Sequence, residues 1–231
     1  MARSLGSVLV PAYARGLMPQ VLKPEVRARI LVAGLEVFAQ HGYEGTTMSA
    51  IAEQAELGAA SLYRYYPSKA ELFDAVITPE LAAEFERLLD QRVRSLAQLP
   101  ASAPFAPRGE HGQEMLDFWL AHRLAVVVLL DRAAGTAYEH YGEKFVSLLT
   151  KSTLAQIRSA TPNVEVSPAA RLVLTQIFES TRRTLAEILL HSQNPRVLRE
   201  AIELFWSYQI PGLHGFAAWL RSNARTPGSR A

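Results

Sequence analysis

TTMSAIAEQAELGAASLYRYYPSK, residues 46–69, predicts two short helices joined by a tight turn. The first would run from about Thr47 to Gln54, with an N-cap hydroxyl from Thr46 or Thr47. Gly58 permits the turn and serves as an N-cap for a second helix over about 59–65. Pro67 ends that helix, because proline lacks the amide hydrogen that the helix needs. Ser68 then caps a third helix.

The second helix has an unusual composition for an exposed segment. It contains one large aliphatic residue, Leu62, which we expect to point inward. Small residues at 59–61 permit close approach to a groove, and no acidic residue lies between Gly58 and Ala70. Tyrosine, arginine and lysine side chains donate hydrogen bonds to phosphates and base edges. This composition is typical of the recognition helix of a helix-turn-helix.

Residues 27–77 resemble the DNA-binding domain of the TetR family of transcriptional regulators. The resemblance rests on residues in matching order and spacing: Arg29-Ile30-Leu31, Phe38-Ala39, Gly42-Tyr43, Thr46-Thr47-Met48, Ile51-Ala52, Leu62-Tyr63-Arg64-Tyr65-Tyr66, Ser68-Lys69 and Glu71-Leu72-Phe73. Two positions depart from the family pattern. Glu56 stands where the turn usually has glycine, and Gly58 stands where a serine cap is usual. Glu56 would be strained if this position needs a positive φ.

The resemblance implies an all-α protein with two functional parts. A three-helix helix-turn-helix domain would occupy 24–77, and a larger helical ligand-sensing and dimerisation domain would occupy 78–222. Residues 1–23 would form a flexible arm, for which a secretory signal is the less favoured alternative, and 223–231 a disordered tail. The last two long helices, predicted over 168–192 and 195–222, would pair with their symmetry mates in a homodimer.

The expected DNA contacts follow from the proposed recognition helix. Phosphates would be bound by Thr47, Tyr63, Tyr66 and Lys69, and base edges by Ala60, Ser61, Arg64 and Tyr65. Thr46 and Ala59 complete the predicted DNA-binding set. Arg64 is the candidate for guanine, because its guanidinium can donate two parallel hydrogen bonds.

Helical periodicity continues through the rest of the chain. Thr78-Pro79 predicts a break, and further helices are expected over 79–99, 113–134 and 138–161, with Pro211-Gly212 kinking or splitting the last one. A pocket for a small ligand needs apolar walls with a few polar groups. The candidate ligand-binding residues are Trp119, His122, Tyr138, Phe145 and Phe178, although core packing is the competing interpretation for each. Because no basic cluster marks an acidic ligand, we expect a largely apolar or aromatic one.

Composition and charge exclude some classes of protein and show which part of the chain is basic. The 231 residues include no cysteine, which excludes thiolate catalysis and is consistent with a cytoplasmic protein, and no apolar run approaches the ~20 residues of a membrane span. Residues 1–70 hold seven basic and five acidic residues, so the net charge of +2 lies in the part expected to meet DNA. We find no catalytic motif and no histidine pair at metal-binding spacing, and therefore predict neither metal nor cofactor.

The sequence thus predicts a homodimeric DNA-binding regulator, a repressor released by a small, largely apolar ligand. Its partners would be double-stranded operator DNA and a small-molecule effector. Two alternatives stay open. One is a DNA-binding dimer without ligand control, and the other is a cytosolic α-helical enzyme in which the helix-turn-helix serves only packing.

Overall fold

The structure is a computed structural model that describes residues 23–97, 109–161 and 164–222. The predicted arm, apart from Lys23, and the predicted tail lie outside these residues. The described residues form α-helices and one π-helical turn, η1: α1 (Pro24–Gly45), α2 (Met48–Gln54), α3 (Ala59–Tyr65), α4 (Lys69–Val76), α5 (Pro79–Ala97), α6 (Glu110–Ala121), α7 (Arg123–Val127), η1 (Val128–Arg132), α8 (Tyr141–Ala160), α9 (Pro168–His191) and α10 (Pro195–Ser222).

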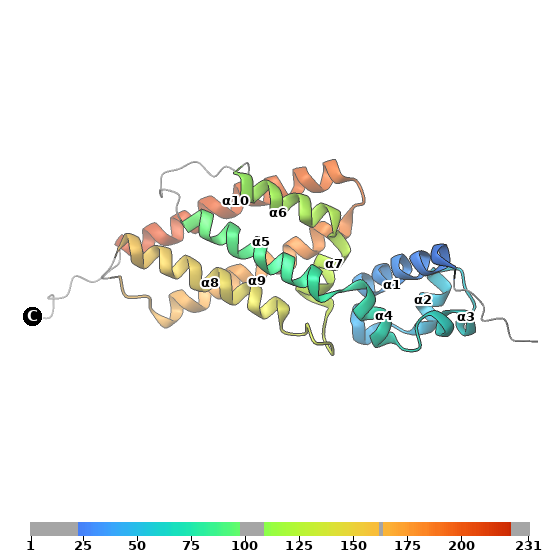
Figure 1. The fold of residues 1–231 in the computed structure, drawn as a ribbon. Helices are drawn as coiled ribbons and strands as arrows, with labels where there is room; N and C mark the ends of the chain where they lie inside the picture. Colours follow the sequence, from blue (N-terminus) through green and yellow to red (C-terminus); the bar gives the residue numbers. More distant parts are fainter. Residues whose placement is uncertain (1–22, 98–108, 162–163, 223–231) are drawn as a thin grey trace, which may run out of the picture.

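The helices form an elongated molecule with two ends (Figure 1). Helices α1–α4 form one end, and α5, α6, α8, α9 and α10 form a bundle that makes up the other. The break between them falls at Thr78, as predicted, and its hydroxyl caps α5 by accepting a hydrogen bond from the Leu81 N–H at 3.3 Å. The all-α prediction is confirmed.

One helix prediction in the larger part was wrong. The single helix expected over 113–134 is interrupted at His122, whose φ of −117° and ψ of 30° separate α6 from α7. The chain then widens into η1, a turn type that is often found at functional sites. Of the two alternatives predicted at Pro211-Gly212, the structure excludes a split, because α10 continues past the exposed Pro211.

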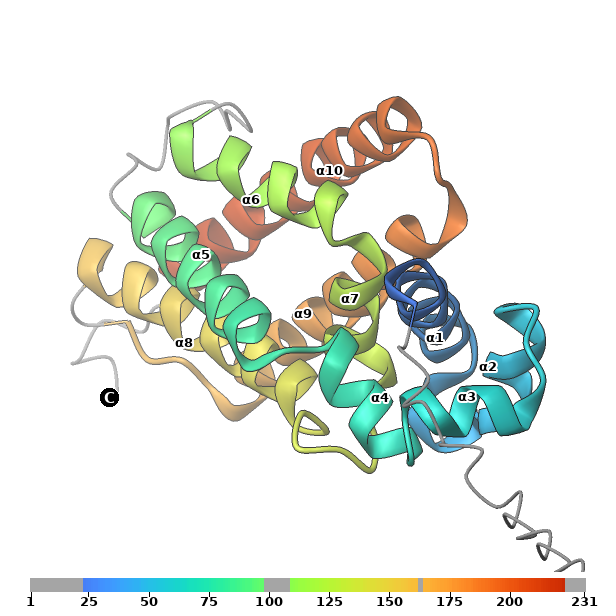
Figure 2. The same cartoon turned by 45° about the vertical axis from the view of Figure 1, so that its right-hand side comes forward.

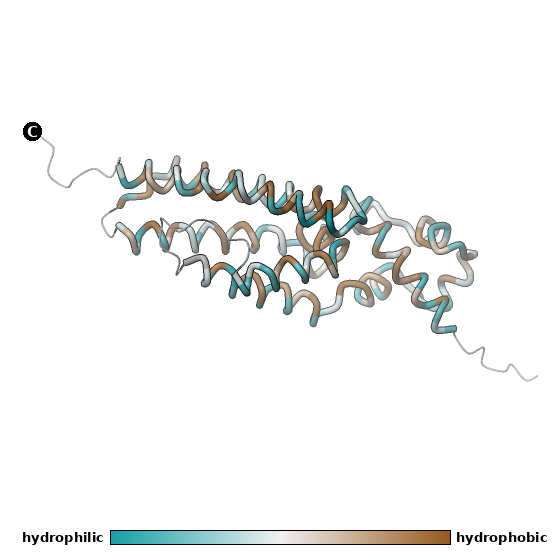
Figure 3. The backbone as a smooth tube through the Cα atoms, turned by 90° about the horizontal axis from the view of Figure 1, so that it is seen from above, coloured by the Kyte–Doolittle hydropathy of each residue, from teal (hydrophilic) through white to brown (hydrophobic). Residues whose placement is uncertain are grey.

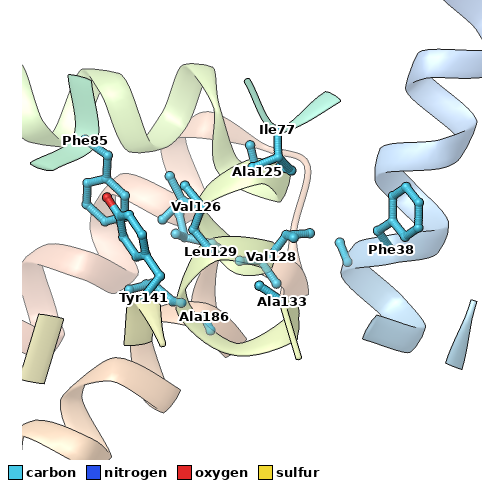
Figure 4. Packing of buried hydrophobic residues seen from close by; sticks show 14 of the residues in the cluster. Phe38, Ile77, Phe85, Ala125, Val126, Val128, Leu129, Ala133, Tyr141 and Ala186 are labelled. Atoms are coloured by element: carbon cyan, nitrogen blue, oxygen red, sulfur yellow. The ribbon is translucent and has the colours of Figure 1, made fainter. Parts of the chain in front are cut away.

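The break and the π-helical turn serve to pack α7 and η1 between the two ends of the molecule. Figure 2 shows α7 beside α1, and residues from both ends belong to one continuous hydrophobic core. Figure 4 shows Phe38 of α1 on one side of Val128 and Ala133, with Phe85 and Tyr141 on the other. The end formed by α1–α4 therefore shares its core with the bundle.

Glycine allows two close approaches around η1. A Cβ at Gly142 of α8 would lie 2.5 Å from the Leu130 carbonyl oxygen, so only glycine fits there. The Arg182 guanidinium of α9 donates to the same carbonyl at 2.5 Å and to Asp131 at 2.6 Å. In the loop after η1, Gly135 has a φ of +80° and lies against Glu44. These contacts fix η1 between α8, α9 and the end of α1.

Aromatic rings form a chain of contacts from one end of the molecule to the other. Tyr43 packs against Phe73 at 5.1 Å between ring centroids, and Phe73 lies 6.5 Å from Tyr138. Tyr138 in turn lies 6.5 Å from Tyr141, which stacks on Phe85 at 5.5 Å. The chain ends in the bundle, where Phe85 lies 6.5 Å from Phe145 and 5.7 Å from Phe118.

Hydrophobic and hydrophilic residues alternate along the helices, as Figure 3 shows. This pattern is typical of helices that bury one face in a shared core. Within residues 23–97, 109–161 and 164–222, no helix has the length and apolar character needed to cross a membrane.

Candidate nucleic-acid interface

The turn between α2 and α3 has a defined hydrogen-bonding pattern. Thr47 caps α2, its hydroxyl accepting from the Ala50 N–H at 3.1 Å. At the other end of α2, the Leu57 N–H bonds to the Ala52 carbonyl at 2.8 Å and the Glu56 N–H to the Glu53 carbonyl at 2.9 Å. This pair of bonds is the Schellman motif, whose penultimate residue takes the left-handed conformation. Glu56 accordingly has a φ of 52°, as its departure from glycine had suggested.

Helix α3 has the predicted bounds and the predicted inner and outer faces. Leu62 is fully buried, whereas the outer stripe is exposed and consists of Ala59, Ala60, Tyr63 and Arg64. Ser61 is half-buried, and its hydroxyl accepts a hydrogen bond from Arg64 Nη2 at 3.2 Å. Small side chains with one arginine and one tyrosine thus form the exposed surface of this helix.

The N-terminal end of α1 lies beside the C-terminal end of α3 and adds a basic residue that we had not predicted as part of the site. Arg27 Nε donates to the Tyr66 hydroxyl at 3.1 Å, and the Lys23 backbone N–H donates to the Tyr65 hydroxyl at 3.1 Å. The hydrogen bond to Tyr66 raises the already high pKa of Arg27. Arg27 is exposed, and so α1 and α3 contribute to one positively charged surface.

Lys69 and Thr46 have structural contacts that differ from the expected DNA-binding roles. The Lys69 ammonium donates to the carbonyls of Tyr43 at 2.7 Å and Thr46 at 2.9 Å, and it lies 4.3 Å from the centre of the Tyr43 ring. The Thr46 side chain is buried, with its hydroxyl donating to the Gly42 carbonyl at 2.6 Å. Both side chains satisfy carbonyls at the end of α1, where Gly42 leaves helical geometry.

The arrangement is a helix-turn-helix, in which an exposed short helix is held by α1 and α2 against a shared core. Its exposed face carries no carboxylate, so nothing on it repels the phosphates of DNA. The match to the family model for bacterial regulatory proteins of the tetR family covers residues 30–76.

Residues 30–76 thus form a helix-turn-helix domain of the TetR type. Over 64 residues, the chain is 45% identical to the HTH-type transcriptional repressor KstR of Rhodococcus jostii. These 64 residues make up 28% of this chain and 28% of KstR. It is 28% identical over 148 residues to the HTH-type transcriptional repressor SCO4008 of Streptomyces coelicolor, covering 59% of this chain and 69% of that protein. The match to KstR therefore spans little more than a quarter of that relative's length.

A solved structure of a tetR-family regulator from Streptomyces coelicolor aligns over 90% of this chain and 93% of its own, with 16% identity. The TM-score of 0.37 is too low to support any statement about the site.

The larger part of the chain, beyond the helix-turn-helix, contains a cavity between α5, α6, α8 and α10. Its volume is about 70 Å³, and its walls are almost entirely apolar. Trp119 and Phe145, two of the predicted ligand-binding residues, line it. Among the described residues, no group of acidic and histidine side chains is placed to hold a metal ion.

The other three predicted ligand-binding residues do not line this cavity. His122 is exposed at the break after α6, where its ring lies 4.8 Å from Phe118. Tyr138 lies between the two ends of the molecule, where burial and the nearby acidic side chains raise its pKa. Phe178 is buried in the core of the bundle. The sequence could not show that His122 lies away from the cavity, because it predicted one continuous helix where the chain breaks at this residue.

Most of the residues that line the cavity were not predicted as ligand-binding, among them Arg92, Glu203 and Trp206. Arg92 belongs to α5 and the other two to α10. The sequence contained little to indicate that Arg92 and Glu203 border a cavity, since a charged residue on an amphipathic helix normally faces solvent.

Proposed function

We propose that this protein is a DNA-binding transcriptional repressor that acts as a homodimer in the cytoplasm and is released from its operator by a small, largely apolar ligand. The observation that carries the proposal is the exposed, acid-free face of α3 in a helix-turn-helix. KstR and SCO4008 are both named as repressors, which supports repression over activation. It also favours a regulator over the alternative of an α-helical enzyme.

In the proposed complex, α3 of each protomer enters the major groove, and two half-sites lie about 34–36 Å apart or somewhat more. Arg64 would read a guanine, with Ala60, Ser61 and Tyr65 against neighbouring base edges. Thr47 and Tyr63 would bind phosphates together with the Tyr66 hydroxyl, and Arg27 would add a phosphate contact. Lys69 would support the site through the end of α1, and any phosphate contact would require it to leave its carbonyl partners.

A homodimer through α9 and α10 is supported by large apolar side chains that the monomer leaves exposed. On α10 these are Val197, Leu204, Tyr208 and Trp219, with exposed fractions of 47–80%. Their spacing of seven, four and eleven residues places them on one side of the helix. Leu172 and Val173 of α9 are also exposed, at 61% and 49%. Such a stripe fits an isologous interface with a second copy of the chain.

The aromatic chain offers a route from ligand to DNA. Phe145 lines the cavity and is connected through Phe85, Tyr141 and Tyr138 to Phe73, which packs under the helix-turn-helix. Packed side chains of this kind couple sites when their arrangement has two states. A ligand that displaces Phe145 would therefore alter the support of α3.

The test is salt-dependent binding to the DNA upstream of the protein's own gene, followed by operator mapping. We expect Arg64→Ala to weaken operator binding by about 1–3 kcal/mol and to relax specificity at one base pair. Arg158→Ala is the matched control, because it removes an equal charge from an exposed position on α8. Absence of salt-dependent binding would contradict the proposal. Equal losses on all sequences from Arg64→Ala would contradict its base-reading role.

A further inference from the structure

Helix α9 reaches η1 through one charged side chain that is largely withdrawn from solvent. The Arg182 side chain is 12% exposed. Its Nη1 donates to the Leu130 carbonyl at 2.5 Å and to the Asp131 carboxylate at 2.6 Å, and its Nε donates to Glu179 of the same helix at 3.0 Å. Leu130 lies in the last turn of η1, where carbonyls have no donor within the helix. Arg182 therefore supplies an external donor to this turn and pairs with the acid beside it.

Two further contacts hold the same turn against α8 and α9. Arg132, the last residue of η1, pairs with Glu187 of α9 at 3.4 Å, although solvent screens this more exposed pair. Gly142 of α8 leaves the space that Arg182 occupies, because a Cβ there would lie 3.0 Å from Arg182 Cδ. The Arg182 contacts are thus the least exposed polar link between α9 and η1.

The other side of η1 supports the C-terminal end of α1. Gly42, where α1 leaves helical geometry, lies next to the Arg132 carbonyl oxygen, which a Cβ at this glycine would approach to 3.6 Å. Phe38 lies on this same side of Val128 and Ala133 (Figure 4). Helices α2 and α3 follow α1 directly along the chain. A displacement of η1 relative to α9 would therefore be passed on to the helix-turn-helix.

A partly buried ion pair is better suited to fixing an arrangement than to stabilising a fold. Removing two charges from water costs free energy that their attraction repays only when the geometry is good, and replacing such a pair by apolar side chains is often neutral for stability. The best-attested role of these groups is to select one register among several. For Arg182, the alternatives are other positions of η1 against α9.

We propose that Arg182 is a positioning residue: by holding Leu130 and Asp131, it fixes the helix-turn-helix in one orientation relative to α9 and so sets the half-site spacing that the dimer reads. The inference rests on the proposed function, in which α9 lies at the dimer interface and both copies of α3 bind one operator. One base pair corresponds to about 3.4 Å along the DNA. A fixed orientation therefore discriminates between operators whose spacing differs by a single base pair.

The first measurement uses no DNA. The chain has no cysteine, so Glu53→Cys, at an exposed position of α2, places one spin label on each protomer. Double electron–electron resonance then gives the distribution of distances between the two labels of a dimer. We expect a narrow distribution in the protein with Arg182 and a broader or displaced one in Arg182→Met, which removes the donors but keeps a long side chain. Arg158→Met, at an exposed position of α8, is the control and should leave the distribution unchanged.

The second measurement is the affinity for the mapped operator and for two versions of it, with one base pair inserted or removed between the half-sites. We expect Arg182→Met to reduce the preference for the native spacing by about 2- to 30-fold, as for residues that couple distant sites. A substitution that only destabilised the protein would weaken binding to all three DNAs by the same factor. Asp131→Asn, which keeps an oxygen acceptor but removes the charge, should act in the same direction and replaces Arg182→Met if that variant does not fold.

An unchanged distance distribution or an unchanged spacing preference in Arg182→Met would overturn the positioning role, and so would an equal response to Arg158→Met. If the labelled protein gives no dipolar signal, no dimer forms, and the homodimer fails together with the positioning role. If the distribution responds to Arg182→Met in a protein that binds no operator, the DNA-binding function alone fails and the orienting contact stands.

Discussion

Glu56 holds the left-handed position of the Schellman motif between α2 and α3, with a φ of 52°. This conformation costs an L-residue with a Cβ roughly 1–2 kcal/mol, whereas glycine adopts it freely. Glycine also gains more freedom in the unfolded chain, which offsets about 0.4–1 kcal/mol of the benefit. We therefore expect Glu56→Gly to raise the free energy of unfolding by about 1 kcal/mol, or the melting temperature by about 2–4 °C.

The measurement is thermal and urea unfolding at one fixed protein concentration, because the proposed dimerisation would make the melting temperature depend on concentration. Glu56→Ala is the control, since it removes the carboxylate but keeps a Cβ at the same φ. If Glu56→Ala stabilises the protein as much as Glu56→Gly, the charge and not the backbone conformation is responsible, and the reasoning fails. Both variants should bind DNA more tightly and to the same extent, because each removes one acidic residue next to α3.

Lys69→Met should lower the free energy of unfolding by about 1–3 kcal/mol in urea, because the Thr46 and Tyr43 carbonyls both lose the ammonium donor and Tyr43 keeps only its bond from the Thr46 N–H. The exposed Lys151→Met should change little, and equal effects of the two substitutions would refute the capping role of Lys69. Gly142→Ala should cost about 1–3 kcal/mol, because its Cβ would meet the Leu130 carbonyl oxygen, while Lys144→Ala on the same helix should stay within about 0.5 kcal/mol. Leu204→Glu should convert the proposed dimer to monomers, measured as molar mass by light scattering after size-exclusion chromatography. A dimer mass that is unchanged by the substitution would exclude this face as the interface.

The helix-turn-helix could be predicted closely because its signals are local. Caps at Thr47 and Ser68, the turn at Gly58 and the stop at Pro67 act within a few residues, and α3 begins and ends where these signals place it. The backbone strain at Glu56 could also be predicted, because the family pattern usually has glycine at this position of the turn.

The roles of Lys69 and Thr46 could not be predicted, because their partners lie at the end of α1. A lysine that donates to carbonyls has the same sequence signal as one that faces phosphate. The cavity was predicted only in part for a related reason. Trp119 and Phe145 line it, but the break at His122 depends on how α7 packs against α1 and α9, and no local signal marks it.

The core that α1 shares with α7 and η1 limits how freely the two ends could be exchanged between proteins. Helices α1–α4 have the outline of a separate unit in Figure 1, but Gly42 lies against the Arg132 carbonyl and Phe73 against Tyr138. A chimera that joined residues 24–77 to another sensing domain would leave these surfaces uncovered unless the recipient supplied an equivalent of η1. The DNA-binding end is thus a domain in shape without being an interchangeable module, and a change of operator specificity is better attempted within α3 than by transplanting the whole unit.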